Sequence, residues 1–140
     1  MNIQIVCAGH SLLAHERAWM EEYEKRSQRF AKLEIVRVKE KQSKELTWKE
    51  MKSYKIDNST SILLDPKGEL LTTNQFAELF KGNLTFYVGG SNGLPDEAKK
   101  AGKLISLTPL TLPHRIALLV LLEQVYRVLT LRAGTPYHHA

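Results

Sequence analysis

Residues 84–93 read Leu-Thr-Phe-Tyr-Val-Gly-Gly-Ser-Asn-Gly, an apolar segment that passes directly into a glycine-rich loop. The five residues before the glycines predict a short buried β-strand, because nearly all of their side chains are apolar rather than every second one. In open parallel sheets, ligands bind beyond the carboxyl ends of the strands, where glycines let a ligand approach the backbone. An ordinary turn from a strand into a helix also favours glycines, so this loop alone indicates either a binding site or a turn.

Alternating strand and helix patterns extend on both sides of this segment. Further strands are expected at residues 2–8, 33–38, 61–64 and 104–107. Helices are expected at residues 11–30, 72–81 and 115–132, with another that begins at residues 95–97 and ends before Gly102. A turn at residues 65–68 should end the third strand, and residues 39–59 should form a loop with one short, weak helix. The pattern predicts a single α/β domain over residues 1–140, with a parallel sheet covered by helices on both faces.

Several protein classes are disfavoured by what the sequence lacks. It has no P-loop, no dinucleotide-binding glycine motif after the first strand and no nucleophile elbow, which disfavours NTPases, dehydrogenases and serine hydrolases. The single cysteine, Cys7, excludes an intramolecular disulfide and a cysteine-based zinc site, so no metal is expected, and its apolar neighbours predict a buried thiol. The longest wholly apolar run, residues 116–122, is far shorter than the roughly 18 residues of a membrane span. With no visible signal peptide either, a cytoplasmic protein without a membrane partner is expected.

Positive charge is concentrated in residues 24–55, which hold eleven Lys or Arg against five Glu, whereas the whole chain has a net charge of +5. Such a segment is typical of proteins that bind a polyanion such as nucleic acid. Because Lys and Glu alternate through much of it, a solvated amphipathic face explains the segment equally well. Charge alone does not decide between these interpretations.

The last expected helix is unusually apolar. Of the sixteen residues 116–131, twelve are apolar, and the exceptions are Glu123, Gln124, Arg127 and Thr130. So narrow a polar stripe predicts burial on two sides, against the chain's own sheet and against a partner chain, which indicates a homodimer. An unusually deep core helix is the alternative.

Two further segments have the composition of binding elements. Residues 107–114, Leu-Thr-Pro-Leu-Thr-Leu-Pro-His, are uncharged and contain two prolines, so they predict a rigid loop that holds an uncharged base by main-chain contacts and apolar walls. Residues 134–138, Gly-Thr-Pro-Tyr-His, combine an aromatic ring for stacking on a base with a histidine for proton handling. A frayed chain end is the alternative for the last histidines.

Four motifs now stand in order along the chain: residues 89–94 (GGSNGL), 111–114 (TLPH), 123–127 (EQVYR) and 134–138 (GTPYH). With the Leu64-Asp65 strand end, Gly68 and residues 72–77 upstream, the sequence resembles the RlmH (YbeA-like) family. These are SPOUT-class methyltransferases that modify N3 of a pseudouridine in large-subunit (23S) ribosomal RNA. The resemblance spans the whole chain and is dense from Leu63 onward.

The resemblance implies a SPOUT, or α/β-knot, fold with a trefoil knot in about residues 84–140, an exception to the rule that chains do not thread loops. It also implies a homodimer that binds S-adenosyl-L-methionine and acts on ribosomal RNA in the assembled ribosome. By position, the cofactor would contact Leu64, Gly89, Leu107, Thr108, Pro109, Leu110, Thr111 and Leu112, and Gly90 of the same glycine loop is expected there too.

The resemblance further places His114, Arg127, Tyr137 and His138 near the substrate, with the tail reaching the partner's pocket. His138 is the candidate for proton handling, Tyr137 for stacking on the base, and Arg127 for binding a phosphate or organising the pocket. Arg115 is a candidate substrate-binding residue, since it neighbours a position where the family usually has arginine.

Two departures from the family keep other functions open. Leu118 stands where the family usually has that arginine, and the region 41–58 is shorter than usual. One alternative is a SPOUT methyltransferase of another RNA, such as transfer RNA. Another is a non-catalytic protein that binds RNA or the ribosome and keeps only the knot, and a third is a generic nucleotide-binding α/β domain.

Overall fold

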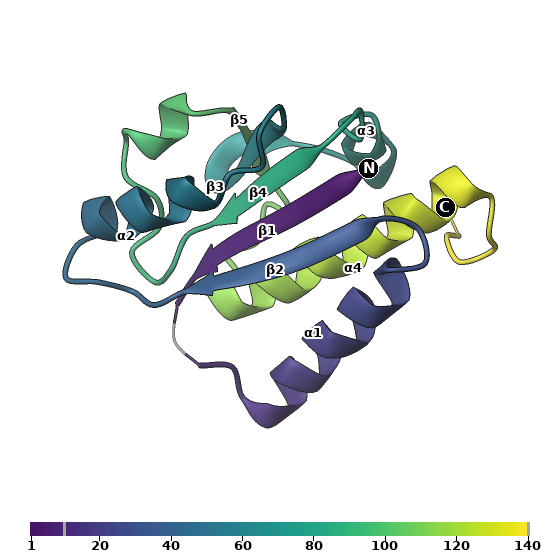
Figure 1. The fold of residues 1–140 in the computed structure, drawn as a ribbon, viewed down its shortest axis with the longest axis horizontal. Helices are drawn as coiled ribbons and strands as arrows, with labels where there is room; N and C mark the ends of the chain where they lie inside the picture. The colour runs from purple at the N-terminus through teal and green to yellow at the C-terminus, as the bar shows by residue number, and fades with distance from the viewer. Residues whose placement is uncertain (10, 140) are drawn as a thin grey trace.

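A computed structural model describes residues 1–9 and 11–139; residue 140, the last of the expected domain and knot region, lies outside the described residues (Figure 1). In this part of the chain, five strands form one sheet in the order β2-β1-β4-β3-β5, and every neighbouring pair is parallel. The strands are β1 (Asn2–Ala8), β2 (Lys32–Val38), β3 (Thr60–Leu70), β4 (Leu84–Val88) and β5 (Lys103–Ser106). The predicted parallel α/β sheet is therefore confirmed.

Helices cover both faces of the sheet, as predicted. Their bounds are α1 (Ala14–Ser27), α2 (Lys44–Met51), α3 (Thr73–Ala77) and α4 (His114–Ala133), with short 3-10 turns η1 (Lys52–Tyr54) and η2 (Ala98–Lys100). Figure 1 shows α1 and α4 running side by side across one face, with α2 on the other. Because successive strand residues point to opposite faces, Ile5 belongs to the core under α4, whereas Val6 joins Trp48 and Tyr87 on the α2 side.

Helix α4 is the longest described helix and matches the predicted range within one residue at each end. It ends at Gly134, whose φ of +73° is the left-handed conformation that glycine adopts easily at a helix end. Leu118, at the family's usual arginine position, is 3% exposed and packs in the core beneath the sheet. Cys7 is buried as expected, and burial raises the pKa of its thiol to about 11.

Strand β3 is longer than predicted. The expected turn at residues 65–68 lies inside it, as a register shift against β5 between Leu64 and Glu69. Asp65 Oδ1 accepts a hydrogen bond from Lys67 N at 2.8 Å, which is turn chemistry, but the chain bulges outward and then resumes pairing with β5. The turn predicted at residues 65–68 is present as a bulge, and the prediction that it ends the strand is wrong.

The helix expected from residues 95–97 to Gly102 is wrong, because only the 3-10 turn η2 forms there. A Cβ on Gly102 would collide with the backbone of Ser61, so the chain must already run beside β3 at that point. The helix predicted at 72–81 is also shorter, although Thr72 Oγ1 does accept from Gln75 N at 3.2 Å, as a capping box requires.

The segment predicted as a loop with a weak helix is better ordered than expected. Ser43 Oγ caps α2 by accepting a hydrogen bond from Leu46 N at 3.1 Å. Trp48 then packs edge-on against Tyr87, with ring centroids 4.8 Å apart, and is 3% exposed. These contacts between residues far apart in sequence stabilise a helix that local composition alone does not favour.

Candidate functional site

A pocket of about 510 Å³ opens at the carboxyl ends of β4 and β5, beside the bulge in the middle of β3. Three separated segments line it: residues 64–66, 88–93 (without residue 92) and 105–114, joined by Ala117. All nine residues predicted to contact the cofactor are in this lining, namely Leu64, Gly89, Gly90, Leu107, Thr108, Pro109, Leu110, Thr111 and Leu112. The glycine loop and the proline-rich loop therefore converge, as the parallel-sheet argument requires.

The loop that forms most of this lining is held by hydrogen bonds between its own side-chain hydroxyls and its backbone. Ser106 Oγ donates to the carbonyl oxygen of Thr108 at 3.0 Å, and Thr108 Oγ1 accepts from Leu110 N at 3.2 Å. Leu110 itself is 74% exposed, which leaves a large apolar side chain at the mouth of the pocket. The pocket has the size and mainly apolar walls that a small-molecule site needs, and its uncharged loop suits an adenosine.

The glycines at this site have a structural explanation. A Cβ on Gly89 would lie 2.7 Å from the carbonyl carbon of Gly93, and one on Gly90 would collide with the carboxylate of Glu40. Glu40 Oε1 in turn accepts a hydrogen bond from Ser91 N at 2.5 Å. Gly89 is thus required by close packing against the backbone of the loop itself, whereas a side chain at position 90 would displace the Glu40 carboxylate that ties the loop to the segment following β2.

The two predicted substrate-binding residues at the start of α4 have different surroundings. His114 lines the pocket, and its ring packs so closely on Gly9 that a Cβ there would lie 2.7 Å from Nε2. Arg115 is not in the lining: its Nε lies 3.5 Å from Glu16 Oε2. Glu16 is 4% exposed and also accepts from Leu13 N at 2.8 Å, so Arg115 joins α4 to the first turn of α1.

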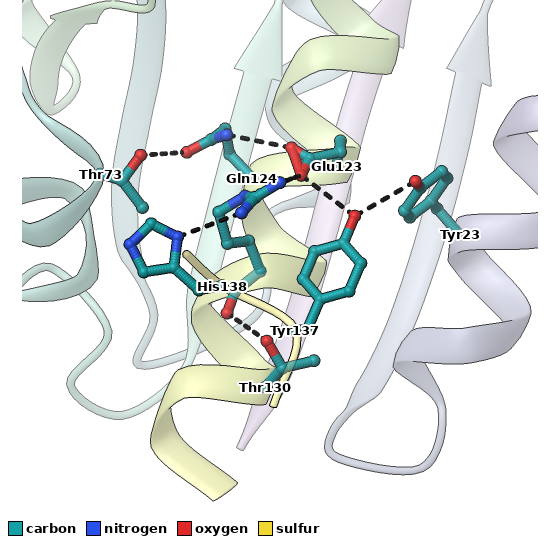
Figure 2. A network of polar contacts seen from close by, with 8 residues as sticks. Tyr23, Thr73, Glu123, Gln124, Thr130, Tyr137 and His138 are labelled. Carbon is teal, nitrogen blue, oxygen red and sulfur yellow. Dashed lines mark hydrogen bonds and ion pairs between the residues drawn. The ribbon is translucent and has the colours of Figure 1, made fainter. Parts of the chain in front are cut away.

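The three predicted catalytic residues meet one another elsewhere on α4 (Figure 2). Arg127 Nη1 lies 3.1 Å from His138 Nδ1, and the guanidinium carbon of Arg127 lies 4.7 Å from the ring centroid of Tyr137. Because a guanidinium only donates, Nδ1 of His138 accepts this bond.

Glu123 is at the centre of this cluster, although the sequence did not single it out as a site residue. Its Oε1 accepts from Arg127 Nε at 2.8 Å and from the Tyr137 hydroxyl at 3.3 Å. Gln124 Nε2 donates to its other oxygen at 3.0 Å, and Thr73 Oγ1 donates to Gln124 Oε1 at 2.8 Å (Figure 2). The available signal was the four-residue spacing of Glu123 and Arg127, which brings the two side chains together on an otherwise apolar helix.

The surroundings of the cluster set the protonation of its members. Burial, the hydrogen bond with Tyr23 and the nearby charge of Glu123 raise the pKa of Tyr137 above its usual value near 10. The hydrogen bond to Glu123 raises the pKa of Arg127 above its usual value. At neutral pH, Tyr137 is therefore a phenol that donates hydrogen bonds, and Arg127 is a cation.

The cluster and the pocket are separated within one chain. Glu123 and Arg127 follow His114 by nine and thirteen residues of α4, which corresponds to about 14 and 20 Å along the helix axis. Tyr137 and His138 lie against these residues, and neither lines the pocket. Within the single chain, the glycine loop and the proline-rich loop converge on the pocket, and the tail does not.

Two kinds of feature are absent from residues 1–9 and 11–139. No helix there has the length and hydropathy needed to cross a membrane. Within the same residues, no group of three or more His, Cys, Asp or Glu side chains is placed to hold a metal ion.

Comparisons with known proteins extend over the whole chain. A family described as "Predicted SPOUT methyltransferase" matches residues 1–138. The chain is 42% identical over 143 residues to a protein of Thermus thermophilus named ribosomal RNA large subunit methyltransferase H, covering 99% of this chain and 98% of that protein. Proteins of the same name from Deinococcus radiodurans and Clostridium novyi are 36% and 33% identical, each over 99% of both chains.

Proposed function

The chain belongs to the SPOUT methyltransferase family, and on this premise we propose that it methylates N3 of a pseudouridine in large-subunit (23S) ribosomal RNA, with S-adenosyl-L-methionine as donor and the assembled ribosome as substrate. One observation carries the proposal most directly. The nine residues chosen from sequence as cofactor contacts line one pocket, formed by the bulge of β3 and the carboxyl ends of the parallel strands β4 and β5. The relatives' names supply the ribosomal substrate, and that substrate in turn implies a cytoplasmic location.

The residues present fit an adenosyl cofactor. The loop of residues 107–112 offers backbone amides and carbonyls beside apolar walls, which suit an uncharged adenine and ribose. S-adenosyl-L-methionine, when bound, supplies a methyl group on a positively charged sulfur. The pocket residues then need only to hold the methyl group in line with the incoming nitrogen and to exclude water.

The tail is proposed to serve the pocket of a partner subunit. Its cluster lies about 14–20 Å along α4 from the pocket of its own chain, so an antiparallel pairing of two α4 helices would bring it to the other pocket. Apolar side chains available for such a pairing include Ile116, which is 37% exposed, and Trp19 on the adjacent α1, which is 46% exposed. The trefoil knot and the homodimer belong to this proposal.

The cluster supplies the groups that the substrate requires. N3 of a pseudouridine is a neutral imide nitrogen and must lose its proton as the bond to the methyl carbon forms. His138 would handle this proton, but its Nδ1 accepts from Arg127, so it must leave Arg127 or rotate before it can act as a base. Tyr137, held as a phenol, offers its ring for stacking, and Arg127 offers a charge for RNA phosphate.

Contact with ribosomal RNA would also involve the basic segment of residues 24–55. Part of its charge is already paired within the protein: Lys41 Nζ lies 2.8 Å from Glu50, and Lys52 Nζ lies 3.5 Å from Glu97. The remaining excess of Lys and Arg gives a general attraction for phosphate rather than recognition of a sequence.

A methyl-transfer assay tests the proposal. Ribosomes from a strain that lacks the modification, their extracted RNA and bulk transfer RNA are each incubated with the protein and labelled S-adenosyl-L-methionine. We expect incorporation into intact ribosomes and into neither RNA alone. Incorporation into transfer RNA would favour the other-RNA alternative, and the absence of saturable cofactor binding in calorimetry would favour a non-catalytic RNA-binding protein.

A further inference from the structure

Asp65 gives the pocket a negative charge that none of the proposed roles uses. It lies in the bulged part of β3, is 8% exposed and belongs to the pocket lining. Among the described residues of that lining it is the only acid, and no lysine or arginine accompanies it. A buried carboxylate beside mainly apolar walls acts over a longer distance than a surface charge, because little water screens it.

The carboxylate of Asp65 has two partners in the protein. Oδ1 accepts from Lys67 N at 2.8 Å, which stabilises the bulge. Oδ2 lies 3.4 Å from Nζ of Lys99, a residue of η2 that does not line the pocket and that also lies 3.6 Å from Asp96. The charge of Asp65 is therefore balanced in part, and from outside the pocket.

Charge is also what distinguishes the proposed donor from its product. S-adenosyl-L-methionine carries a sulfonium besides its ammonium and carboxylate, so its net charge is one unit more positive than that of S-adenosyl-L-homocysteine, whose sulfur is a neutral thioether. We propose that Asp65 makes the pocket prefer the charged donor over the uncharged product, and that Lys99 sets the strength of this preference by partly neutralising Asp65. The inference rests on the proposed function, since it requires both molecules to bind in this pocket.

The test compares dissociation constants for the two molecules, measured by calorimetry on the full chain without RNA. Asp65→Asn keeps an oxygen that can accept from Lys67 N but removes the charge, so we expect the preference for S-adenosyl-L-methionine to fall about three- to tenfold. Lys99→Gln leaves the pocket lining unchanged and removes the balancing charge, so the preference should rise. The two variants thus have opposite expected signs, which a general loosening of the bulge would not produce.

Lys103→Gln is the matched control. Lys103 also forms an ion pair, with Glu69 at 2.8 Å, but it lies at the amino end of β5, away from the pocket. Its substitution makes the same change in net charge and should leave the preference unchanged.

The outcomes separate the inference from the function on which it rests. If the natural protein binds neither molecule, the proposed function fails. If it binds both and Asp65→Asn weakens them equally, or Lys99→Gln lowers the preference, the inference is overturned and the proposed function stands. If Asp65→Asn is too unstable to measure, the preference for S-adenosyl-L-methionine is compared between Lys99→Gln and Lys103→Gln. This comparison still decides whether the inference holds, because neither substitution alters the hydrogen bond between Asp65 and Lys67 N.

Discussion

The hydroxyl oxygens of Tyr23 and Tyr137 lie 3.2 Å apart, although 114 residues separate them in the chain. The ring of Tyr137 also packs edge-on against Tyr126, with centroids 4.7 Å apart. The tail is therefore docked between α1 and α4 of its own subunit (Figure 2). A tail ordered in this way can be offered to a second subunit without the entropy cost of ordering it on binding.

Tyr23→Phe should loosen the tail with little effect on the rest of the fold. The substitution removes one hydroxyl from a partly buried pair and leaves Tyr137 with Glu123 as its remaining partner, which costs about 0.5–1.5 kcal/mol. We expect faster amide hydrogen exchange in residues 134–139 and an unchanged rate in β1 and β4. Tyr54→Phe removes an exposed hydroxyl and is the control, since it should change neither rate. Equal exchange in the tail of both variants would contradict the docking role of Tyr23.

Tyr137 should make the stability of the protein depend on pH in the alkaline range. Its pKa is raised in the folded state by burial, by Tyr23 and by Glu123, so the folded protein keeps a proton that the unfolded chain loses near pH 10. The unfolding free energy should therefore fall as pH rises above about 10, and should be insensitive to this group below that. Tyr137→Phe should show a shallower decline in denaturant titrations between about pH 9 and 11.

The comparison with Tyr137→Phe is needed because burial also raises the pKa of Tyr87, which contributes a decline of the same sign. Glu123→Gln gives a second measurement, by absorbance of the tyrosinate. Removing the negative charge should move the titration of Tyr137 back towards pH 10. Identical pH profiles for the natural chain and Tyr137→Phe would show that Tyr137 does not keep its proton in the folded state.

Gly90→Ala should destabilise the pocket loop through a collision with Glu40. The added Cβ would overlap the Glu40 carboxylate and displace this flexible side chain from Ser91 N, at a cost of about 0.5–1.5 kcal/mol in unfolding free energy. In a Glu40→Ala background the collision is absent, so the same substitution should cost less than about 0.5 kcal/mol. Denaturant unfolding of the two single variants and the double variant measures this coupling.

Gly93→Ala is the matched control for that cycle. Nothing lies within 4 Å of a Cβ at this position, but its φ of +72° strains any residue other than glycine. We expect a cost of about 1–2 kcal/mol that is the same with and without Glu40. The collision would be contradicted if the cost of Gly93→Ala changed when Glu40 is replaced. It would also be contradicted if the cost of Gly90→Ala did not change.

Local sequence patterns were sufficient for most of the fold. The alternation of apolar strands with helices predicted the parallel sheet, and α4 was located within one residue at each end because its apolar run and Gly134 mark its bounds. The failures lie where pairing decides the backbone. The continuation of β3 past Asp65 depends on β5, and the short η2 depends on how closely Gly102 approaches Ser61.

The same distinction holds for the candidate site. Most of the lining was predictable because the carboxyl ends of parallel strands meet at one edge of the sheet, so the loops after β4 and β5 had to converge on either side of β3. Glu40 and Glu123 were missed as site residues because their roles come from contacts with Ser91 and Tyr137, which no local pattern contains. The position of the tail cluster along α4, away from its own pocket, was likewise visible only in the structure.

If the tail of one subunit completes the pocket of the other, two inactive variants should restore each other's activity when their subunits are mixed. His138→Ala alters only the tail, and Ala117→Phe adds a ring to the wall of the pocket. His138→Ala alone should lower turnover far more than cofactor affinity, and Ala117→Phe alone should lose cofactor binding. When the subunits are mixed, a heterodimer has one site with an intact pocket from one chain and an intact tail from the other. Equal mixing should return about a quarter of the natural activity, since half of the dimers are mixed and each has one good site.

The doubly substituted chain, mixed with either single variant, is the control and should return none. If each tail serves its own pocket, the His138→Ala and Ala117→Phe mixture stays inactive as well, and the arrangement of two subunits proposed here is wrong.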